Sequence, residues 1–320
     1  MRSPQELVTA IASGERKALS QAITIIESSL DSDMARSEEL LQDLAPNTGG
    51  AVRIGITGVP GVGKSTFIDA LGTSLTREGH KVAVLAVDPS SSISGGSILG
   101  DKTRMERLSQ DPDAFIRPTP GGDAVGGVAR HTREAMLLCE AAGFDVLLVE
   151  TIGVGQSELA VASMVDTFVL LLLAGAGDEL QGIKRGVMEL ADIFVINKAD
   201  GPNTEPALQA ARQYTAALQL IPQRNPAWAP TVTICSSVHG DGIEDVYKQV
   251  LEHREALGSA GIAENRQDQA LHWFDHTLRE MVVSSFLARS EVCAALPGLR
   301  EQVQSGALQP TAAVSRLLAI

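Results

Sequence analysis

The feature that most constrains this chain is a glycine-rich stretch at residues 58–66, which reads Gly-Val-Pro-Gly-Val-Gly-Lys-Ser-Thr. An apolar run over residues 52–57 precedes it, and a helical pattern starts at residue 67. The stretch satisfies the G-x-x-x-x-G-K-[ST] spacing and stands between a strand pattern and a helix pattern, the context in which this spacing binds phosphate. The sequence therefore predicts a P-loop, the backbone turn that holds nucleotide phosphates.

Each residue type in this loop suits that task. The glycines let the backbone bend so that several N–H groups point into one concavity, where they and the helix N-terminus attract phosphates. Lys64 can reach the β- and γ-phosphate oxygens, and Ser65 can ligate Mg²⁺. The residues expected to hold the nucleotide phosphates are Gly58, Val59, Pro60, Gly61, Val62, Gly63, Lys64, Ser65 and Thr66.

The charge balance limits the partners of the chain. Its 26 basic and 39 acidic residues give a net charge of −13, which opposes binding to nucleic acid or to an anionic membrane, because such binding needs clustered lysine and arginine. The three cysteines, Cys139, Cys235 and Cys293, show no C-x-x-C spacing, which indicates buried thiols in a reducing compartment rather than a zinc site. The first residues lack the apolar segment of a signal peptide, and the longest apolar run, residues 168–174, is too short to span a membrane. We expect a cytoplasmic protein with neither a nucleic-acid nor a membrane partner.

Apolar runs alternate with helical patterns through the middle of the chain. Besides the run before the P-loop, strands are expected at residues 82–87, 145–150, 167–173, 192–197 and 231–235, and helices at 65–78, 128–142, 205–218 and 243–257. Such continuous apolar runs are typical of strands that are buried on both faces of a mostly parallel sheet. The predicted fold is α/β, with a helical N-terminal extension over 1–50, a P-loop domain over 51–258 and a helical C-terminal segment over 259–320.

The tetrapeptide Asn197-Lys198-Ala199-Asp200 starts at the last residue of the strand expected at 192–197 and has the N-K-x-D pattern. The Asp200 carboxylate can accept from both N1–H and the exocyclic amine of guanine, a pair of donors that adenine does not offer, so a site of this kind can discriminate strongly. Asn197 can secure the loop and approach the purine edge, while the stem of Lys198 can lie over the ring. Ser236, Ser237 and Val238 follow the last expected strand and stand where a second base-contacting loop would lie. The P-loop domain is therefore expected to be a GTPase domain that binds GTP and GDP.

Three acidic residues stand at positions suited to a metal ion. Asp88 follows the strand at 82–87, Glu150 ends the strand at 145–150, and Asp101 lies in a glycine-rich segment. Carboxylates at strand ends beside a P-loop can hold Mg²⁺ directly or through water and can order the attacking water. Each could also be an ordinary helix-capping or turn residue. Glu150 and Gly153 have a spacing in which the Gly153 amide could sense the γ-phosphate.

Longer motifs accompany these residues in a fixed order and give the chain a close resemblance to the MeaB/ArgK family, the bacterial relatives of the human methylmalonic aciduria type A protein. The resemblance covers essentially the whole length. The motifs are the P-loop, Val-Asp-Pro-Ser-Ser at 87–91, Gly-Gly-Ser-Ile-Leu-Gly-Asp-Lys-Thr-Arg-Met at 95–105, Glu-Thr-Ile-Gly-Val-Gly-Gln-Ser-Glu at 150–158, Gly-Asp-Glu-Leu-Gln-Gly-Ile-Lys at 177–184 and Asn-Lys-Ala-Asp at 197–200.

The resemblance implies a metallochaperone that binds and hydrolyses GTP, gates the loading of adenosylcobalamin and protects or reactivates a cobalamin-dependent acyl-CoA mutase. It implies a switch loop at 177–184 that reorganises when the mutase binds and in which Asp178 and Lys184 contact nucleotide or partner; the alternative is that 178–184 is merely a polar start of a helix. The sequence shows no evident arginine finger, so we expect slow basal hydrolysis that accelerates when the partner orders Lys184 near the developing charge. Asp88, Asp101 and Glu150 are implied to be the Mg²⁺ and switch acids, with Ser65 as a further metal ligand. The residues expected to act in hydrolysis are Lys64, Asp88, Glu150, Asp178 and Lys184. Direct cobalamin binding is not expected, because no Asp-x-His-x-x-Gly sequence is present.

The resemblance also implies a homodimer formed through the C-terminal segment. Ala270, Phe274, Leu278 and Met281 recur on one helical stripe, with Trp273 beside it. Such a stripe must be buried either against the chain's own P-loop domain or against a second copy.

Two other functions remain compatible with a P-loop. One is an ATP-dependent kinase linked to amino-acid transport, against which the guanine pattern at 197–200 argues. The other is a nickel-insertion GTPase, which would need a cluster of cysteine or histidine ligands, whereas the six histidines of this chain are scattered. The sequence leaves open which acyl-CoA mutase would be the partner.

Overall fold

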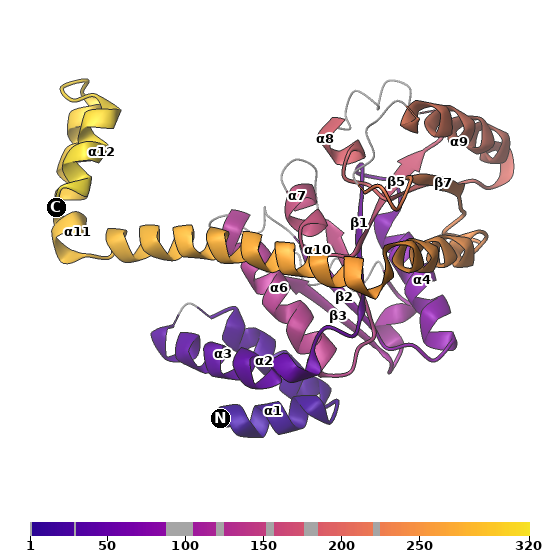
Figure 1. Cartoon of the computed structure of the whole chain (residues 1–320), viewed down its shortest axis with the longest axis horizontal. Coiled ribbons are helices and arrows are strands. Elements are labelled where there is room, and N and C mark those ends of the chain that lie inside the picture. Colours follow the sequence, from indigo (N-terminus) through magenta and orange to yellow (C-terminus); the bar gives the residue numbers. More distant parts are fainter. Residues whose placement is uncertain are drawn as a thin grey trace. The chain divides into compact units, whose positions relative to one another are not determined.

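The structure is a computed structural model that describes residues 2–28, 30–87, 105–119, 125–151, 157–175, 185–219 and 225–320. The chain divides into two compact units, Met1–Gln267 and Asp268–Ile320. Figure 1 shows the helices and strands of both units. The expected boundary at residue 258 stays a prediction.

The first unit is built on a parallel sheet. Its strands, within the described residues, are β1 (Val52–Gly58), β2 (Val82–Val87), β3 (Ala114–Thr119), β4 (Val146–Thr151), β5 (Thr167–Leu173), β6 (Ile193–Asn197) and β7 (Thr231–Ile234). They form one seven-stranded sheet in the order β3-β2-β4-β1-β5-β6-β7, and every ladder between neighbours is parallel. The predicted α/β class with a mostly parallel central sheet is confirmed.

One strand was not expected. β3 forms an edge of the sheet and pairs with β2 from Val82↔Ala114 to Val87↔Thr119. Its sequence, Ala-Phe-Ile-Arg-Pro-Thr, has only a short apolar run and contains Pro118, which lacks a backbone donor and is tolerated in a sheet mainly at an edge. The weak periodicity therefore hides a strand that tertiary pairing with β2 stabilises.

The helices of the first unit cover both faces of this sheet or precede it. They are α1 (Pro4–Ala12), α2 (Arg16–Ile26), α3 (Asp31–Leu44), α4 (Lys64–Arg77), α6 (Val125–Ala141), α7 (Ser157–Ala162), α8 (Arg185–Met188), α9 (Thr204–Leu218) and the first part of α10 (Ile243–Leu287). Short 3₁₀ turns lie at Ala45–Asn47, Leu108–Gln110 and Gly201–Asn203. α1, α2 and α3 pack on one another and on α6, which places the N-terminal extension on the flank of the P-loop domain.

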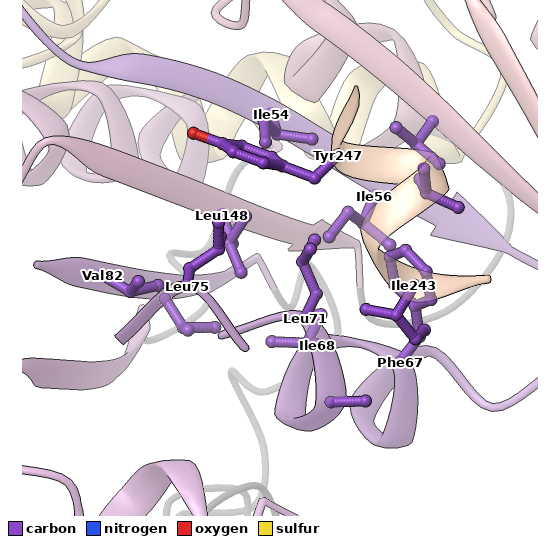
Figure 2. Close-up of a cluster of buried hydrophobic side chains, with 14 of the residues drawn as sticks. Ile54, Ile56, Phe67, Ile68, Leu71, Leu75, Val82, Leu148, Ile243 and Tyr247 are labelled. Carbon is purple, nitrogen blue, oxygen red and sulfur yellow. The ribbon is translucent and has the colours of Figure 1, made fainter. Parts of the chain in front are cut away.

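One face of the sheet packs against α4 and the start of α10. Figure 2 shows Ile54, Ile56, Val82 and Leu148 of the strands meeting Phe67, Ile68, Leu71 and Leu75 of α4, and Ile243 and Tyr247 of α10. Most of these side chains are completely buried. Burying a large aliphatic or aromatic side chain contributes about 1.5–3 kcal/mol, so this cluster fixes α4, the helix that follows the P-loop, against β1.

The opposite face packs against the segment that contains α7. Gly55 of β1 illustrates how closely, because a Cβ atom there would lie 2.9 Å from a methyl group of Val161 and 3.0 Å from one of Val165. These distances are too short for a real contact, so only glycine fits at this position of β1.

The second unit contains the rest of α10, α11 (Ser290–Gln304) and α12 (Pro310–Leu318). Val292, Ala313 and Leu317 are its buried apolar residues, and α11 continues through Pro297.

The helix α10 is interrupted in its first part, which belongs to the first unit: Gly258 has a non-helical backbone with φ 64° and ψ 170°. None of the described helices is long and apolar enough by itself to cross a membrane, although α10 and α11, a bent pair, would meet that criterion when taken together.

Candidate nucleotide-binding site

The P-loop lies at the carboxyl end of β1, as the sequence predicts. β1 ends at Gly58 and α4 begins at Lys64, with Gly63 as its N-cap residue in the left-handed conformation at φ 97° and ψ 32°. A side chain at Gly63 would be strained by this backbone, and its Cβ atom would lie 2.8 Å from Nδ2 of Asn197. Gly63 is therefore required both by the left-handed turn and by the close approach of Asn197, the first residue of the loop at 197–200.

Lys64 and Ser65 are the first residues of α4 and stand beside Glu150 of β4. Lys64 Nζ donates to the carbonyl oxygen of Gly58 at 2.8 Å, so its side chain lies back over the P-loop. Ser65 Oγ donates to Glu150 Oε1 at 3.3 Å. Glu150 is 3% exposed, and the register Ile56↔Glu150 places it at the same edge of the sheet as the P-loop. The structure thus brings together the expected phosphate-binding lysine, the expected metal-binding serine and one of the expected acids.

The electrostatics of this corner suit an anionic ligand. Burial lowers the pKa of the Lys64 ammonium below its ordinary value of 10.5, while the nearby carboxylates of Glu150 and Glu158 oppose that shift. The N-terminus of α4 adds a partial positive charge at the same place. A bound phosphate would supply the lysine with a strong partner, so binding would favour its charged form.

Asn197 joins the P-loop to the loop that follows β7. Its Nδ2 donates to the carbonyl oxygen of Val62 at 2.9 Å. Its Oδ1 accepts from Ser237 N at 3.2 Å, from Ser237 Oγ at 2.7 Å and from Cys235 Sγ at 3.4 Å. Asn197 is 1% exposed. The buried Asn197 side chain therefore links the P-loop to the loop after β7 through hydrogen bonds. This agrees with the expectation that Asn197 secures the loop.

Lys198 and Asp200, which flank Ala199, contact the P-loop and the loop after β7, respectively. Lys198 has φ 59° and donates from Nζ to the carbonyl oxygen of Gly61 at 2.7 Å, so its stem runs alongside the P-loop. Asp200 Oδ2 accepts from Ser236 Oγ at 2.7 Å, and Ser236 Oγ in turn accepts from His239 N at 3.3 Å. One hydrogen bond from a serine thus orients the carboxylate that is expected to read guanine.

The loop at 236–238 divides into a supporting and an exposed part. Ser236 and Ser237 are buried and their hydroxyls are engaged by Asp200 and Asn197, whereas Val238 is 68% exposed. The two serines therefore hold Asp200 and Asn197 in place through hydrogen bonds, while Val238 exposes an apolar side chain. Cys235 was not among the residues expected at the site. Burial raises the pKa of its thiol to about 12, so the thiol stays protonated and can donate to Asn197.

Gly242 was also not among the residues expected at the site, although it allows the loop after β7 to turn back against the end of that strand. Its φ is 74°, and a Cβ atom there would lie 2.5 Å from the carbonyl oxygen of Ile234. Only glycine fits such an approach. The Gly-Asp-Gly sequence at 240–242 was the available signal.

The donors at the P-loop fit a magnesium ion. Ser65 Oγ and Glu150 Oε1 are hard oxygen donors close to each other, and Mg²⁺ is usually held by one or two protein oxygens together with phosphates and water. The described residues contain no group of three or more cysteine, histidine, aspartate or glutamate side chains arranged to hold a metal, here or elsewhere. Asp88, Asp101, Asp178 and Lys184, together with Gly153, lie outside the described residues, and their roles stay predictions.

Comparison with known proteins extends the picture to the whole chain. The family model described as "Methylmalonyl Co-A mutase-associated GTPase MeaB" matches residues 19–291. A putative GTPase of Caulobacter vibrioides is 52% identical over 310 residues, which cover 97% of this chain and 95% of that protein. The GTPase ArgK of Escherichia coli is 46% identical over 287 residues, covering 89% and 87%.

A mouse protein and a solved structure are also similar over nearly the whole chain. The mouse mitochondrial methylmalonic aciduria type A homolog is 44% identical over 328 residues, covering 99% of this chain and 79% of that protein. A crystal structure described as that of a LAO/AO transport system kinase is 38% identical, with a TM-score of 0.76 and coverage of 99% and 96%.

Proposed function

The chain belongs to the MeaB family of methylmalonyl-CoA mutase-associated GTPases, and from this premise we propose that it is a GTP-driven chaperone of an adenosylcobalamin-dependent acyl-CoA mutase. In this role it gates the loading of the cofactor and protects or reactivates the mutase, without binding cobalamin itself. The observation that supports the proposal best is the family match over residues 19–291, taken together with a P-loop that contacts the Asn197–Asp200 loop.

The site residues divide the work of binding and hydrolysis among them. The P-loop amides and Lys64 hold the phosphates, and Asp200, oriented by Ser236, selects guanine. Ser65 and Glu150 would hold Mg²⁺, which supplies charge neutralisation at the phosphates when it is bound. Glu150, the residue before the last one of β4, is the carboxylate that would order water near the γ-phosphate. The roles of Asp88, Asp101, Asp178 and Lys184 are part of the same proposal.

A client-stimulated rate follows from the charges near the site. Lys64 and Lys198 are the cations that the described residues place against the P-loop. Transition-state charge on a transferring phosphoryl group needs further cationic stabilisation for fast hydrolysis. We propose that the partner supplies or orders such a group, with Lys184 as the candidate, so that the GTPase is slow alone and faster with its mutase.

The experiment measures steady-state GTP hydrolysis by the purified chain, with and without the adenosylcobalamin-dependent mutase of the same organism. ATP serves as the control nucleotide, and Lys64→Ala serves as the control for contaminating activity. We expect slow GTP turnover that rises severalfold with the mutase, and little turnover of ATP. Equal rates with and without each available acyl-CoA mutase would contradict the partner, while leaving the GTPase activity intact.

The second unit supports a homodimer. Leu271, Phe274, Leu278 and Met281 lie along one side of α10 and are 65%, 61%, 48% and 48% exposed. Their spacing of three and four residues is that of a helix seam that packs against another helix. An apolar stripe of this length is unusual on the surface of a monomer, so we propose that a second copy covers it.

A transport-linked kinase is the second candidate, because the solved structure at 38% identity is described as a transport system kinase. The same hydrolysis assay separates the two functions: a kinase would use ATP and transfer phosphate to a protein, whereas the chaperone would prefer GTP and release inorganic phosphate. We also propose that the chain acts in the cytoplasm. Cys139 and Cys235 are free and buried, as expected, whereas Cys293 is free but exposed, so the expectation that all three thiols are buried is wrong for Cys293.

A further inference from the structure

Strands β1 and β4 stop pairing just before they reach the nucleotide site. Their ladder runs from Val52↔Val146 to Ile56↔Glu150. Beyond that point β1 continues beside β5 as far as Gly58↔Leu171, and β4 continues beside β2 as far as Val87↔Thr151. The ladder therefore leaves the strand that enters the P-loop and the strand that carries Glu150 unconnected at their last residues.

A side-chain hydrogen bond spans this gap. Thr57 Oγ1 and Thr151 Oγ1 lie 2.8 Å apart, and they belong to the two residues that come next in register after Ile56 and Glu150. Thr57 is 1% exposed and Thr151 is completely buried. A buried hydroxyl without a partner costs about 1–3 kcal/mol, so each threonine strongly favours the geometry in which the other is within reach.

The pair lies on the face of the sheet opposite to the nucleotide contacts. Side chains alternate along a strand, so Thr57 shares a face with Gly55, which packs against Val161 and Val165. Glu150, one residue before Thr151, points to the other face, where it meets Ser65 of α4. The two hydroxyls therefore do not face Ser65 or Glu150, and their effect on the reaction would pass through the backbone that carries Gly58 and Glu150.

We propose that Thr57 and Thr151 are positioning residues for GTP hydrolysis, and that their hydrogen bond sets the distance between the P-loop and Glu150. This inference rests on the role of Glu150 in the proposed function. A carboxylate that orders water acts only when it is correctly placed, and a displacement of about 1 Å can lower a rate by about a hundredfold. Nucleotide binding depends mainly on the P-loop and Asp200, so it should be much less sensitive to the pair.

The test replaces both threonines by valine. Removing both partners of a hydrogen bond and keeping the shape is nearly neutral for stability, so the variant Thr57→Val/Thr151→Val should fold. Single variants leave one hydroxyl unpaired and should be less stable. Thr151→Ser keeps the hydroxyl and should retain activity. Thr76→Val is the matched control, because Thr76 is also buried but its hydroxyl donates only to the Thr73 carbonyl within α4.

The measurements are kcat and KM for GTP, GDP affinity and the melting temperature. We expect the double variant to lose at least about tenfold in kcat, with GDP affinity and melting temperature like those of Thr76→Val, and we expect Thr151→Ser to be close to the unchanged protein. Unchanged kcat in the double variant would overturn the proposal. A fall in kcat that is matched by equal losses of GDP affinity and stability would overturn it as well, because it would show a purely structural role.

Glu150→Gln separates this inference from its premise. If Glu150→Gln is inactive and the threonine double variant is fully active, the positioning role is wrong and the assignment of Glu150 stands. If Glu150→Gln hydrolyses GTP at the normal rate, the assignment of Glu150 is wrong, and the positioning role is refuted with it.

Discussion

Replacing Asp166 should destabilise the first unit more than replacing any exposed acid. Asp166 precedes β5, and its carboxylate is completely buried. It accepts from Arg254 Nη1 at 2.6 Å, from Arg266 Nε at 2.8 Å and Nη2 at 2.6 Å, and from Arg53 N at 3.2 Å. Arg266 also donates to the carbonyl oxygens of Gly49 and Ala51, so one aspartate links α10 to the starts of β1 and β5.

The expected magnitude follows from the burial of this cluster. Removing one partner of a buried ion pair typically costs about 3–5 kcal/mol, because the remaining charge is left uncompensated. Asp166→Ala leaves two guanidinium groups in this state, with side chains that are 21% and 15% exposed. Each 1 kcal/mol shifts the melting temperature of a domain of this size by about 2–4 °C, so we expect a decrease of roughly 10 °C. Asp166→Asn, which keeps one acceptor oxygen, should lie between Asp166→Ala and the unchanged protein.

The assay is thermal unfolding followed by the fluorescence of Trp228, in a chain that carries Trp273→Phe. The chain has two tryptophans, and Trp228 reports on the first unit because its Nε1 donates to the Asp192 carbonyl oxygen at 3.0 Å. Asp145→Ala is the control. Asp145 pairs with His80 at 2.8 Å and accepts from Lys81 N at 2.7 Å, but its side chain is 51% exposed, so water can replace these partners and its loss should cost much less than that of Asp166.

Two outcomes would refute this reasoning. The first is a decrease for Asp166→Ala that is no larger than that for Asp145→Ala. The second is simple additivity of Asp166→Ala and Arg266→Gln, because residues that share one buried network should show a coupling of about 0.5–3 kcal/mol.

Four further results are expected. Asp200→Asn should weaken GTP binding by at least about a hundredfold and improve binding of xanthosine triphosphate, because an amide cannot accept from both guanine N–H groups; competition titration measures this, and an unchanged preference would contradict the role of Asp200. Gly63→Ala should lower nucleotide affinity at least about tenfold, because it adds a strained left-handed alanine whose Cβ atom would meet Asn197 Nδ2 at 2.8 Å. Calorimetry checks it against Gly61→Ala: Gly61 is also left-handed, at φ 79°, but a Cβ atom there meets nothing within 4 Å, so the difference between the two variants measures the effect of the contact with Asn197. Bound phosphates favour the protonated form of Lys64, whose pKa in the free protein lies below 10.5, so GTP binding takes up a proton at pH values between that lowered pKa and 10.5. GTP affinity should therefore fall as the pH rises through this range, and constant affinity would refute the linkage. Leu278→Asp should convert a dimer into monomers with the first unit still folded, as seen by light scattering, and a dimer that persists would show that the stripe is not the interface.

Local pattern was sufficient to identify the nucleotide-binding elements. The P-loop needs its glycines, lysine and serine within one turn, and the guanine loop needs four consecutive residues, so both signals are complete within a few positions. The buried parallel strands were equally visible, because a short continuous apolar run such as 167–173 is typical of a strand that is covered by helices on both faces. The family resemblance depended in addition on the longer motifs at 87–91, 95–105, 150–158 and 177–184.

Weak local patterns failed where tertiary contacts decide. β3 carries Arg117 and Pro118 and is a strand because β2 offers it a ladder. The helix α1 lies in the extension over 1–50 that was expected to be helical, but its bounds were not predicted, although Ser3 and Glu6 form a capping box at its start. Leu7 and Ile11 are its two buried residues, too few to give a clear helical period.

What only the tertiary structure decided is which distant residues meet. The sequence names Asn197 and the P-loop as parts of one site, but the structure shows that Asn197 holds Val62 and Ser237 together. It also shows that Thr57 meets Thr151, and that Asp166 accepts hydrogen bonds from Arg254 and Arg266 of α10. The Thr57–Thr151 and Asp166–Arg266 pairs lie 94 and 100 positions apart in the sequence, where periodicity carries no information. The register of the parallel sheet and the packing of the helices on it set the distances between their atoms.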